Sequence, residues 1–264
     1  MSPPVTGEFA RQVARASALR GRQDPVYQLL SDHYTEMLQR LYPVWALVGP
    51  GLADPAHIEI HSRTVMLDSD RLLGDRAAIV TATLQPWRIL VSLGAAIHEV
   101  FHAAHTKPWI AEADIAQGEH PDPTVRQLVA DRRLLEEPRM EAHGIRDHAA
   151  ATARGRFVRK ALRAAVADVI GPALTEAIAL SAVAGQPVSR DLCATAMTYL
   201  QGRTHCDTVD AAVLAPLRPI WERVLGSADV RALDDLYARL VWVDDGDLDA
   251  LNLFAREYRA IVGA

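Results

Sequence analysis

Two histidines and a glutamate, His98, Glu99 and His102, form the pattern H-E-x-x-H near the middle of the chain. On a helix, residues four positions apart lie on the same face, so both imidazoles can bind one metal ion. Glu99 lies on the adjoining part of that face, where it can take a proton from a metal-bound water. These residue types at this spacing indicate metal-dependent hydrolysis. The alternative is a buried pair of histidines that are merely hydrogen-bonded.

The surroundings of these residues favour a metal. The neighbours along the chain carry no charge: Ala95, Ala96, Ile97, Val100, Phe101, Ala103 and Ala104. Such a helix suits burial on several sides, where an unpaired charge would be costly. We expect one zinc ion per chain, because a catalytic zinc takes three protein ligands and keeps one position for water. A third ligand must therefore come from elsewhere.

Several residues compete for the place of third ligand. Glu137 and Glu141 are four apart, so on a helix one can bind the metal while the other hydrogen-bonds a ligand histidine. Glu136 is a further alternative beside them. His105 lies ~10 Å along the helix axis from His98, which favours a supporting or substrate-facing role. Asp114 is also open, although nothing local favours it.

The segment L-E-E-P-R-x-E, residues 135–141, resembles the gluzincin metallopeptidases, in which an acidic residue follows the third-ligand glutamate by four positions. The resemblance implies that Glu137 is the ligand and that Glu141 supports the site by hydrogen bonds. The alternative is that these glutamates lie on a charged, solvent-exposed helix face, where Arg139 balances their charge and no metal is bound. Pro138 in the middle of the helix argues against that alternative, because a kink re-aims the flanking carboxylates.

The same segment, taken together with H-E-x-x-H-A-x-H at 98–105, is similar to zincin-like domains that accompany von Willebrand A modules in bacteria and phages. Residues 135–144 also resemble a segment of the large cobaltochelatase subunit. The similarity spans residues 60–150. It implies a zincin-like fold. Because the D-x-S-x-S motif of the von Willebrand A module is absent, it also implies either that the module has been lost or that a separate von Willebrand A or ATPase chain is a partner.

The pattern of apolar residues predicts the elements that must position this chemistry. A helix begins at Asp24-Pro25, and Pro43 kinks or ends it. Strands are expected at 57–61 and 64–67, and such a strand can pair with an extended substrate. The metal-bearing helix begins at Pro86, and after a connector with a short helix another begins at Asp122-Pro123. Helices follow to the end of the chain.

These elements predict a predominantly helical α+β protein, with a zincin-like core and a small sheet beside the active-site helix. The expected division is a catalytic domain at 1–150 and a helical C-terminal region at 151–264, with a soft boundary.

Charge and composition indicate which partners the protein does not bind and where in the cell it is found. A formal charge of -5 and a pI of about 6.0 argue against nucleic acid and anionic membranes as partners. No stretch reaches the ~18 apolar residues of a membrane span, and Met1 to Arg22 lacks the apolar core of a signal peptide. Cys193 and Cys206 fit reduced thiols. We therefore expect a cytoplasmic protein.

The sequence supports three other kinds of metal site less well than it supports the zinc site. A di-iron bundle needs a second E-x-x-H, but Met140 stands where the second glutamate is required. The spacing of Cys193, His205 and Cys206 matches no zinc pattern. The acidic run at 244–249 fits a helix cap better than a calcium loop.

The function expected from the sequence is that of a zinc metallopeptidase acting on a peptide or protein, with Glu99 as general base. A catalytically silent zincin-fold scaffold or regulator, working with a partner chain, is the alternative.

Overall fold

The computed structural model describes residues 24–81, 84–183 and 188–263. The segment from Met1 to Arg22, for which the sequence predicted no signal peptide, lies outside the described residues. The chain divides into two compact units, 1–103 and 104–264. The boundary falls inside one helix, α5 (Pro86–His105), whose last two residues belong to the second unit. Each unit is described by itself below.

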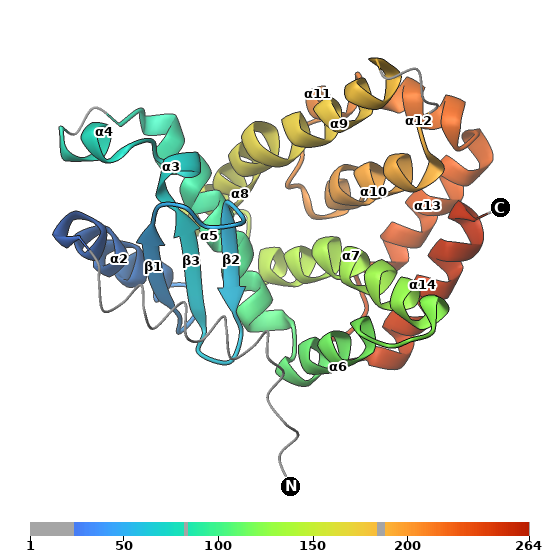
Figure 1. Cartoon of the computed structure of the whole chain (residues 1–264), viewed down its shortest axis with the longest axis horizontal. Helices are drawn as coiled ribbons and strands as arrows, with labels where there is room; N and C mark the ends of the chain where they lie inside the picture. The colour runs from blue at the N-terminus through green and yellow to red at the C-terminus, as the bar shows by residue number, and fades with distance from the viewer. Residues whose placement is uncertain (1–23, 82–83, 184–187, 264) are drawn as a thin grey trace, which may run out of the picture. The chain divides into compact units, whose positions relative to one another are not determined.

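The first unit contains a three-stranded sheet in the order β1-β3-β2 (Figure 1). Its strands are β1 (Trp45–Gly49), β2 (Ala56–Glu59) and β3 (Thr64–Asp68). The pairing of β1 with β3 is parallel, and that of β2 with β3 is antiparallel. Both strands expected from the sequence are confirmed. The third, β1, was not expected, because a short apolar run after a proline lacks the alternation that identifies a strand.

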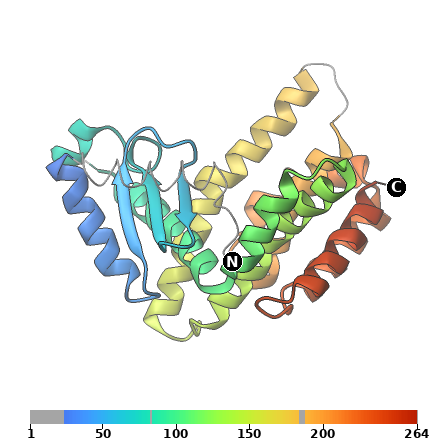
Figure 2. The same ribbon diagram turned by 60° about the horizontal axis from the view of Figure 1, so that its bottom comes forward.

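Helices flank this sheet in the first unit. They are α2 (Pro25–Leu38), α3 (Ser69–Leu72), α4 (Arg76–Val80) and most of α5. The Asp24 side chain accepts a hydrogen bond from the Val26 amide, so the predicted cap-plus-proline start of α2 is confirmed. Figure 2 shows α2 running along β1. The buried hydroxyls of Tyr34 on α2 and Ser92 on α5 are hydrogen-bonded, which ties the two helices together.

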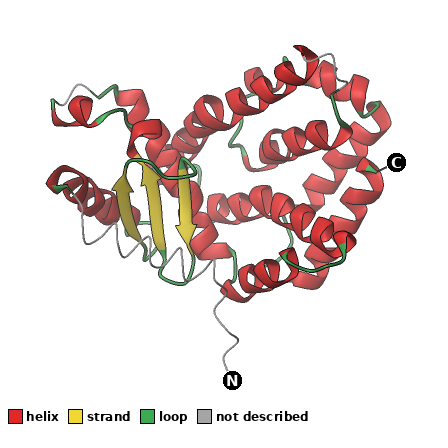
Figure 3. Ribbon diagram, in the orientation of Figure 1, coloured by secondary structure: helices red, strands yellow, loops and turns green. Residues whose placement is uncertain are grey.

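The described residues of the second unit form helices joined by loops and turns, without a strand (Figure 3). Its elements after α5 are α6 (Pro108–Gly118), α7 (Pro123–Arg146), α8 (Ala153–Ala165), the π-helical turn η1 (Val166–Ile170), α9 (Gly171–Val183), α10 (Arg190–Leu200), the 3₁₀ turn η2 (Gly202–Cys206), α11 (Ala211–Leu214), α12 (Arg218–Val224), α13 (Ser227–Leu240) and α14 (Leu248–Val262). The fold is therefore α+β and predominantly helical, as expected.

Helix α7 lies at the centre of the second unit. It packs against α14, α10, α13 and η2, and its Leu135 belongs to the same core as Met197, Trp221 and Tyr237. This shared core places α7 with the C-terminal helices. The contacts thus divide the chain after Ala103, whereas the sequence suggested a soft boundary near residue 150.

Among the described residues, no helix has the length and apolar character needed to cross a bilayer.

Candidate metal centre

The central pattern of the sequence lies on α5, as predicted. The apolar neighbours of the motif, Ile97, Val100 and Phe101, are each at most 2% exposed. The imidazoles of His98 and His102 are half-buried, and their ring centroids are 4.9 Å apart in an edge-to-face arrangement. One helical turn therefore presents two imidazoles on the same side of α5, which is the geometry that a shared metal ion requires.

Glu99 lies on the same turn of α5 and is buried. In the described part of the chain, no ion pair or hydrogen bond engages its carboxylate. The carboxylates of α7 differ in this respect, because arginines hold them. Glu99 is therefore chemically suited to accept a proton from a water molecule.

Helix α7 carries the three glutamates that the sequence offered as ligands. It begins at Asp122, whose side chain accepts from the Thr124 amide, and it continues through Pro138 without ending. Glu136 is buried and forms a paired salt bridge with Arg139, both N···O distances being 2.6 Å. It also accepts from the Thr106 hydroxyl at 2.7 Å. These contacts commit Glu136 to holding α7 against the end of α5.

Glu141 is committed in a different way. Its Oε1 accepts from Nε of Arg203 at 2.9 Å, and its Oε2 accepts from the hydroxyl of Thr208 at 2.9 Å. All three side chains are buried, with Glu141 only 1% exposed. Burial acts to lower the pKa of Arg203, but Glu141 and Glu137 outweigh that effect and hold the pKa above its usual value. Glu141 therefore serves as the buried counter-charge of Arg203.

Glu137 takes the second contact of the same arginine. Nη2 of Arg203 lies 3.2 Å from its Oε2, and 17% of the Glu137 side chain is exposed. Nη1 of Arg203 donates to the carbonyl of Tyr199 at 2.7 Å, so the guanidinium is fixed at three points. The more accessible of the two carboxylates on Arg203 is thus Glu137. These contacts favour Glu137 over Glu141 as a metal ligand.

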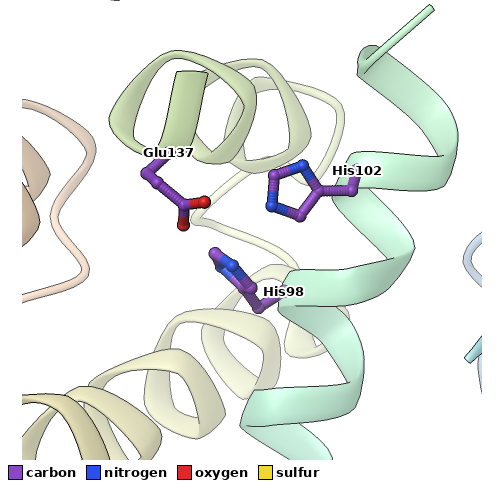
Figure 4. A group of neighbouring side chains, drawn as sticks. All are labelled: His98, His102 and Glu137. Atoms are coloured by element: carbon purple, nitrogen blue, oxygen red, sulfur yellow. The ribbon is translucent and has the colours of Figure 1, made fainter. Parts of the chain in front are cut away.

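Figure 4 shows the imidazoles of His98 and His102 together with the Glu137 carboxylate. One donor atom from each of the three lies within 4.8 Å of the others. Two imidazoles and one carboxylate are the donor set of a common class of catalytic zinc site. The residues present therefore fit a zinc ion chemically.

The other candidates from the sequence have different partners. Asp114 is buried, and Arg132 is hydrogen-bonded to its Oδ1 through Nε at 2.8 Å and also through Nη2. Burial raises the pKa of Asp114 against the opposing effect of Arg132. His105 contacts Asp245 at 2.9 Å. Neither residue belongs to the group of His98, His102 and Glu137.

Two residues of these networks were missed by the sequence reasoning, Arg203 and Asp245. Arg203 is separated from Glu137 by 66 positions and Asp245 from His105 by 140. No local pattern marks either of them. The acidic run that contains Asp245 was assigned to a helix cap, and Asp247 does cap α14 by accepting from the Ala250 amide. The neighbouring Asp245 does not cap the helix but contacts His105 and Arg139.

The cysteines behave as buried thiols rather than metal ligands. Cys193 and Cys206 are both free and buried, and burial raises their pKa values to about 11 and about 12. His205 lies 3.1 Å from Asp234. Among the described residues, none of these joins a group that could hold a metal ion.

Comparison with protein-family models, with curated proteins and with solved structures finds no match to this chain.

Proposed function

We propose that this chain is a zinc-dependent metallopeptidase with a zincin-like core, which hydrolyses peptide bonds with Glu99 as general base. The observation that carries the proposal is the arrangement on α5, where a buried glutamate accompanies two imidazoles whose centroids are 4.9 Å apart. His98, His102 and Glu137 are the proposed ligands of one zinc ion. Arg203 would orient Glu137 through its contact with Oε2.

A zinc ion bound there would lower the pKa of a water molecule towards ~7 and polarise the scissile carbonyl. Glu99 would accept one proton of that water and then give it to the nitrogen of the leaving amine. The C–O bond forms as the C–N bond breaks, so no oxidant or further reactant is needed. The uncharged residues around Glu99 would keep its surroundings of low polarity, which strengthens its interaction with the transferred proton.

The first unit also offers a place for an extended substrate. Strand β2 is an edge of the sheet, because it pairs with β3 on one side only among the described residues. A peptide can add to such an edge through main-chain hydrogen bonds. We therefore propose a peptide or protein substrate. The two free cysteines lead us to propose a cytoplasmic location. The resemblance of residues 60–150 leads us to propose a separate von Willebrand A or ATPase chain as partner.

The metal content of the purified protein tests the ligand set. Elemental mass spectrometry should find zinc in the wild type, a large loss in His102→Ala, and a loss also in Glu137→Ala. The matched control is His205→Ala, which removes a histidine paired with Asp234 and should leave the zinc content unchanged. Zinc retained at the wild-type level by His102→Ala would contradict the proposed site.

Catalysis is tested separately with Glu99→Ala and a peptide library. The variant should keep its zinc and lose turnover by a factor of about 100 or more, because general-base catalysis contributes on that order. Wild-type protein that binds zinc and cleaves nothing in the library, alone or with a partner chain, would favour the scaffold alternative.

A further inference from the structure

A second group of metal-binding residue types lies wholly within the second unit. It consists of His105 at the end of α5, His143 on α7 and Asp245 in the loop before α14. One donor atom from each lies within 4.8 Å of the others, and the two imidazole centroids are 5.6 Å apart. The group shares no residue with His98, His102 and Glu137.

The first imidazole is held between two carboxylates. Nδ1 of His105 lies 2.9 Å from Oδ2 of Asp245, and its Nε2 lies 3.4 Å from Oδ2 of Asp147. The contact with Asp245 is a hydrogen bond, whereas the contact with Asp147 is an ion-pair distance to an exposed carboxylate. A metal ion bound between His105 and Asp245 would take the place of the proton in that hydrogen bond.

The second imidazole has an unusual contact. Nε2 of His143 donates to the carbonyl of Val243 at 2.8 Å, because a carbonyl can only accept. In the neutral ring the lone pair is then on Nδ1, which lies 3.7 Å from Oδ1 of Asp245, too far for a hydrogen bond. Oδ1 of Asp245 accepts a hydrogen bond from Nη1 of Arg139. The Nδ1 lone pair of His143 makes no hydrogen bond to Asp245, and a cation placed between them would contact both.

We propose that His105, His143 and Asp245 form a second metal site, one for a divalent transition metal of the zinc class. Two imidazole nitrogens and one carboxylate suit zinc, and the remaining position is open to water. Nε2 of His143 is anchored on the Val243 carbonyl, which leaves Nδ1 of that ring for a metal ion, and Nδ1 of His105 already faces Asp245. This proposal stands independently of the proposed peptidase activity.

The local charges determine how tightly this second site would bind. Nη1 of Arg139 lies 2.8 Å from Oδ1 of Asp245, and Nζ of Lys107 lies 3.9 Å from Oδ2. The charge of Arg139 is also shared with Glu136. Because these cations compete for Asp245, the second site should release its metal to a chelator before the site on α5 does. Asp245 is 23% exposed at its side chain, so an ion can reach it from solvent.

The experiment is a count of zinc ions bound per folded chain, by equilibrium dialysis followed by elemental mass spectrometry. The proposal predicts about two zinc ions in the wild type and about one in His102→Ala, in His143→Ala and in Asp245→Asn. His205→Ala is the matched control and should bind about two. In the wild type, chelator titration should remove zinc in two steps, and His143→Ala should lack the step at lower chelator concentration.

A single zinc in the wild type, absent from His102→Ala and kept by Asp245→Asn, would overturn the second site and leave the proposed peptidase site intact. Conversely, a zinc content that Asp245→Asn lowers and His102→Ala does not would support the second site and contradict the first. The His102→Ala count does not require any change at the second site, so it decides the matter even if His143→Ala fails to fold.

Discussion

At the scale of single residues, arginines decide what each glutamate of α7 can do. Arg139 holds Glu136, and the completely buried Arg203 holds Glu141 and one oxygen of Glu137. Without Arg203, the buried carboxylate of Glu141 and the partly buried carboxylate of Glu137 would lack their cation in a medium of low polarity. Arg203 therefore stabilises the buried side of α7 through Glu141 and orients the side chain of Glu137.

Replacing Arg203 with methionine should cost about 3–5 kcal/mol of unfolding free energy, because it leaves buried carboxylates without their cation. Urea unfolding followed by circular dichroism measures the loss. The control is Arg40→Met, which breaks an ion pair with Glu36 whose side chains are 67% and 69% exposed. Exposed pairs contribute less than ~1 kcal/mol. Equal losses in the two variants would show that Arg203 is not a structural ion-pair partner.

The two cysteines should be almost inert to thiol reagents in the folded protein. Their pKa values of about 11 and about 12 reduce the reactive thiolate at pH 8 by about 100-fold for Cys193 and about 1,000-fold for Cys206, relative to a thiol with a pKa of 9.0. Burial slows access further. Labelling should rise about tenfold per pH unit below these pKa values, and both thiols should react at once in denaturant. Rapid labelling of folded protein at pH 8 would contradict their burial.

At the scale of elements, the start of α8 is fixed by a close approach of backbone to backbone. The Thr152 hydroxyl accepts a hydrogen bond from the Gly155 amide at 2.9 Å and caps the helix. A Cβ atom at Gly155 would lie 2.1 Å from the carbonyl oxygen of Ala149. No side-chain rotation relieves such a contact, so the turn between α7 and α8 depends on a residue without a side chain.

Gly155→Ala should therefore destabilise the protein by about 1–3 kcal/mol, in the range of overpacking in folded proteins. The control is Gly118→Ala at the end of α6, where the nearest atom to the new Cβ is Nη2 of Arg133 at 3.8 Å. That variant should change stability by no more than about 0.5 kcal/mol. Thermal unfolding of both variants beside the wild type makes the comparison, and a Gly155→Ala curve that overlays the wild type would refute the close approach.

At the scale of the whole molecule, α7 determines where the chain can be divided. Val129, Leu135 and Met140 on α7 are at most 1% exposed, and the helix packs on α10, α13 and α14. A fragment that ends near residue 150 would leave that surface in water. Burying a side chain of this size contributes about 1.5–3 kcal/mol, so exposing all three costs about 4.5–9 kcal/mol, which is comparable to the usual stability of a domain.

In a fragment of residues 1–150, α7 should consequently be unfolded or should drive aggregation, whereas it is folded in the full chain. Circular dichroism and gel filtration of both proteins distinguish the outcomes. A monomeric, cooperatively folding 1–150 fragment would instead support the boundary suggested by the sequence and would show that α7 is stable without the C-terminal helices.

The sequence by itself determined the elements whose signals are local. The 3.6-residue periodicity and the proline starts predicted α2, α5 and α7, alternation predicted β2, and a short run of β-favouring residues predicted β3. It also determined that His98, Glu99 and His102 share one turn, because residues four apart on a helix always do. Strand β1 was not predicted, because four of its five residues are buried and its apolar run carries no alternation.

Only the tertiary structure decided which carboxylates are already engaged and which residues meet from distant parts of the chain. Arg203 reaches Glu137 and Glu141 from more than 60 positions away, and Asp245 meets His105 across 140 positions. Neighbours in sequence encode helix faces through backbone geometry. Ion pairs between distant residues exist only after the core has packed, because packing alone brings those side chains within reach and removes the water that would otherwise solvate them.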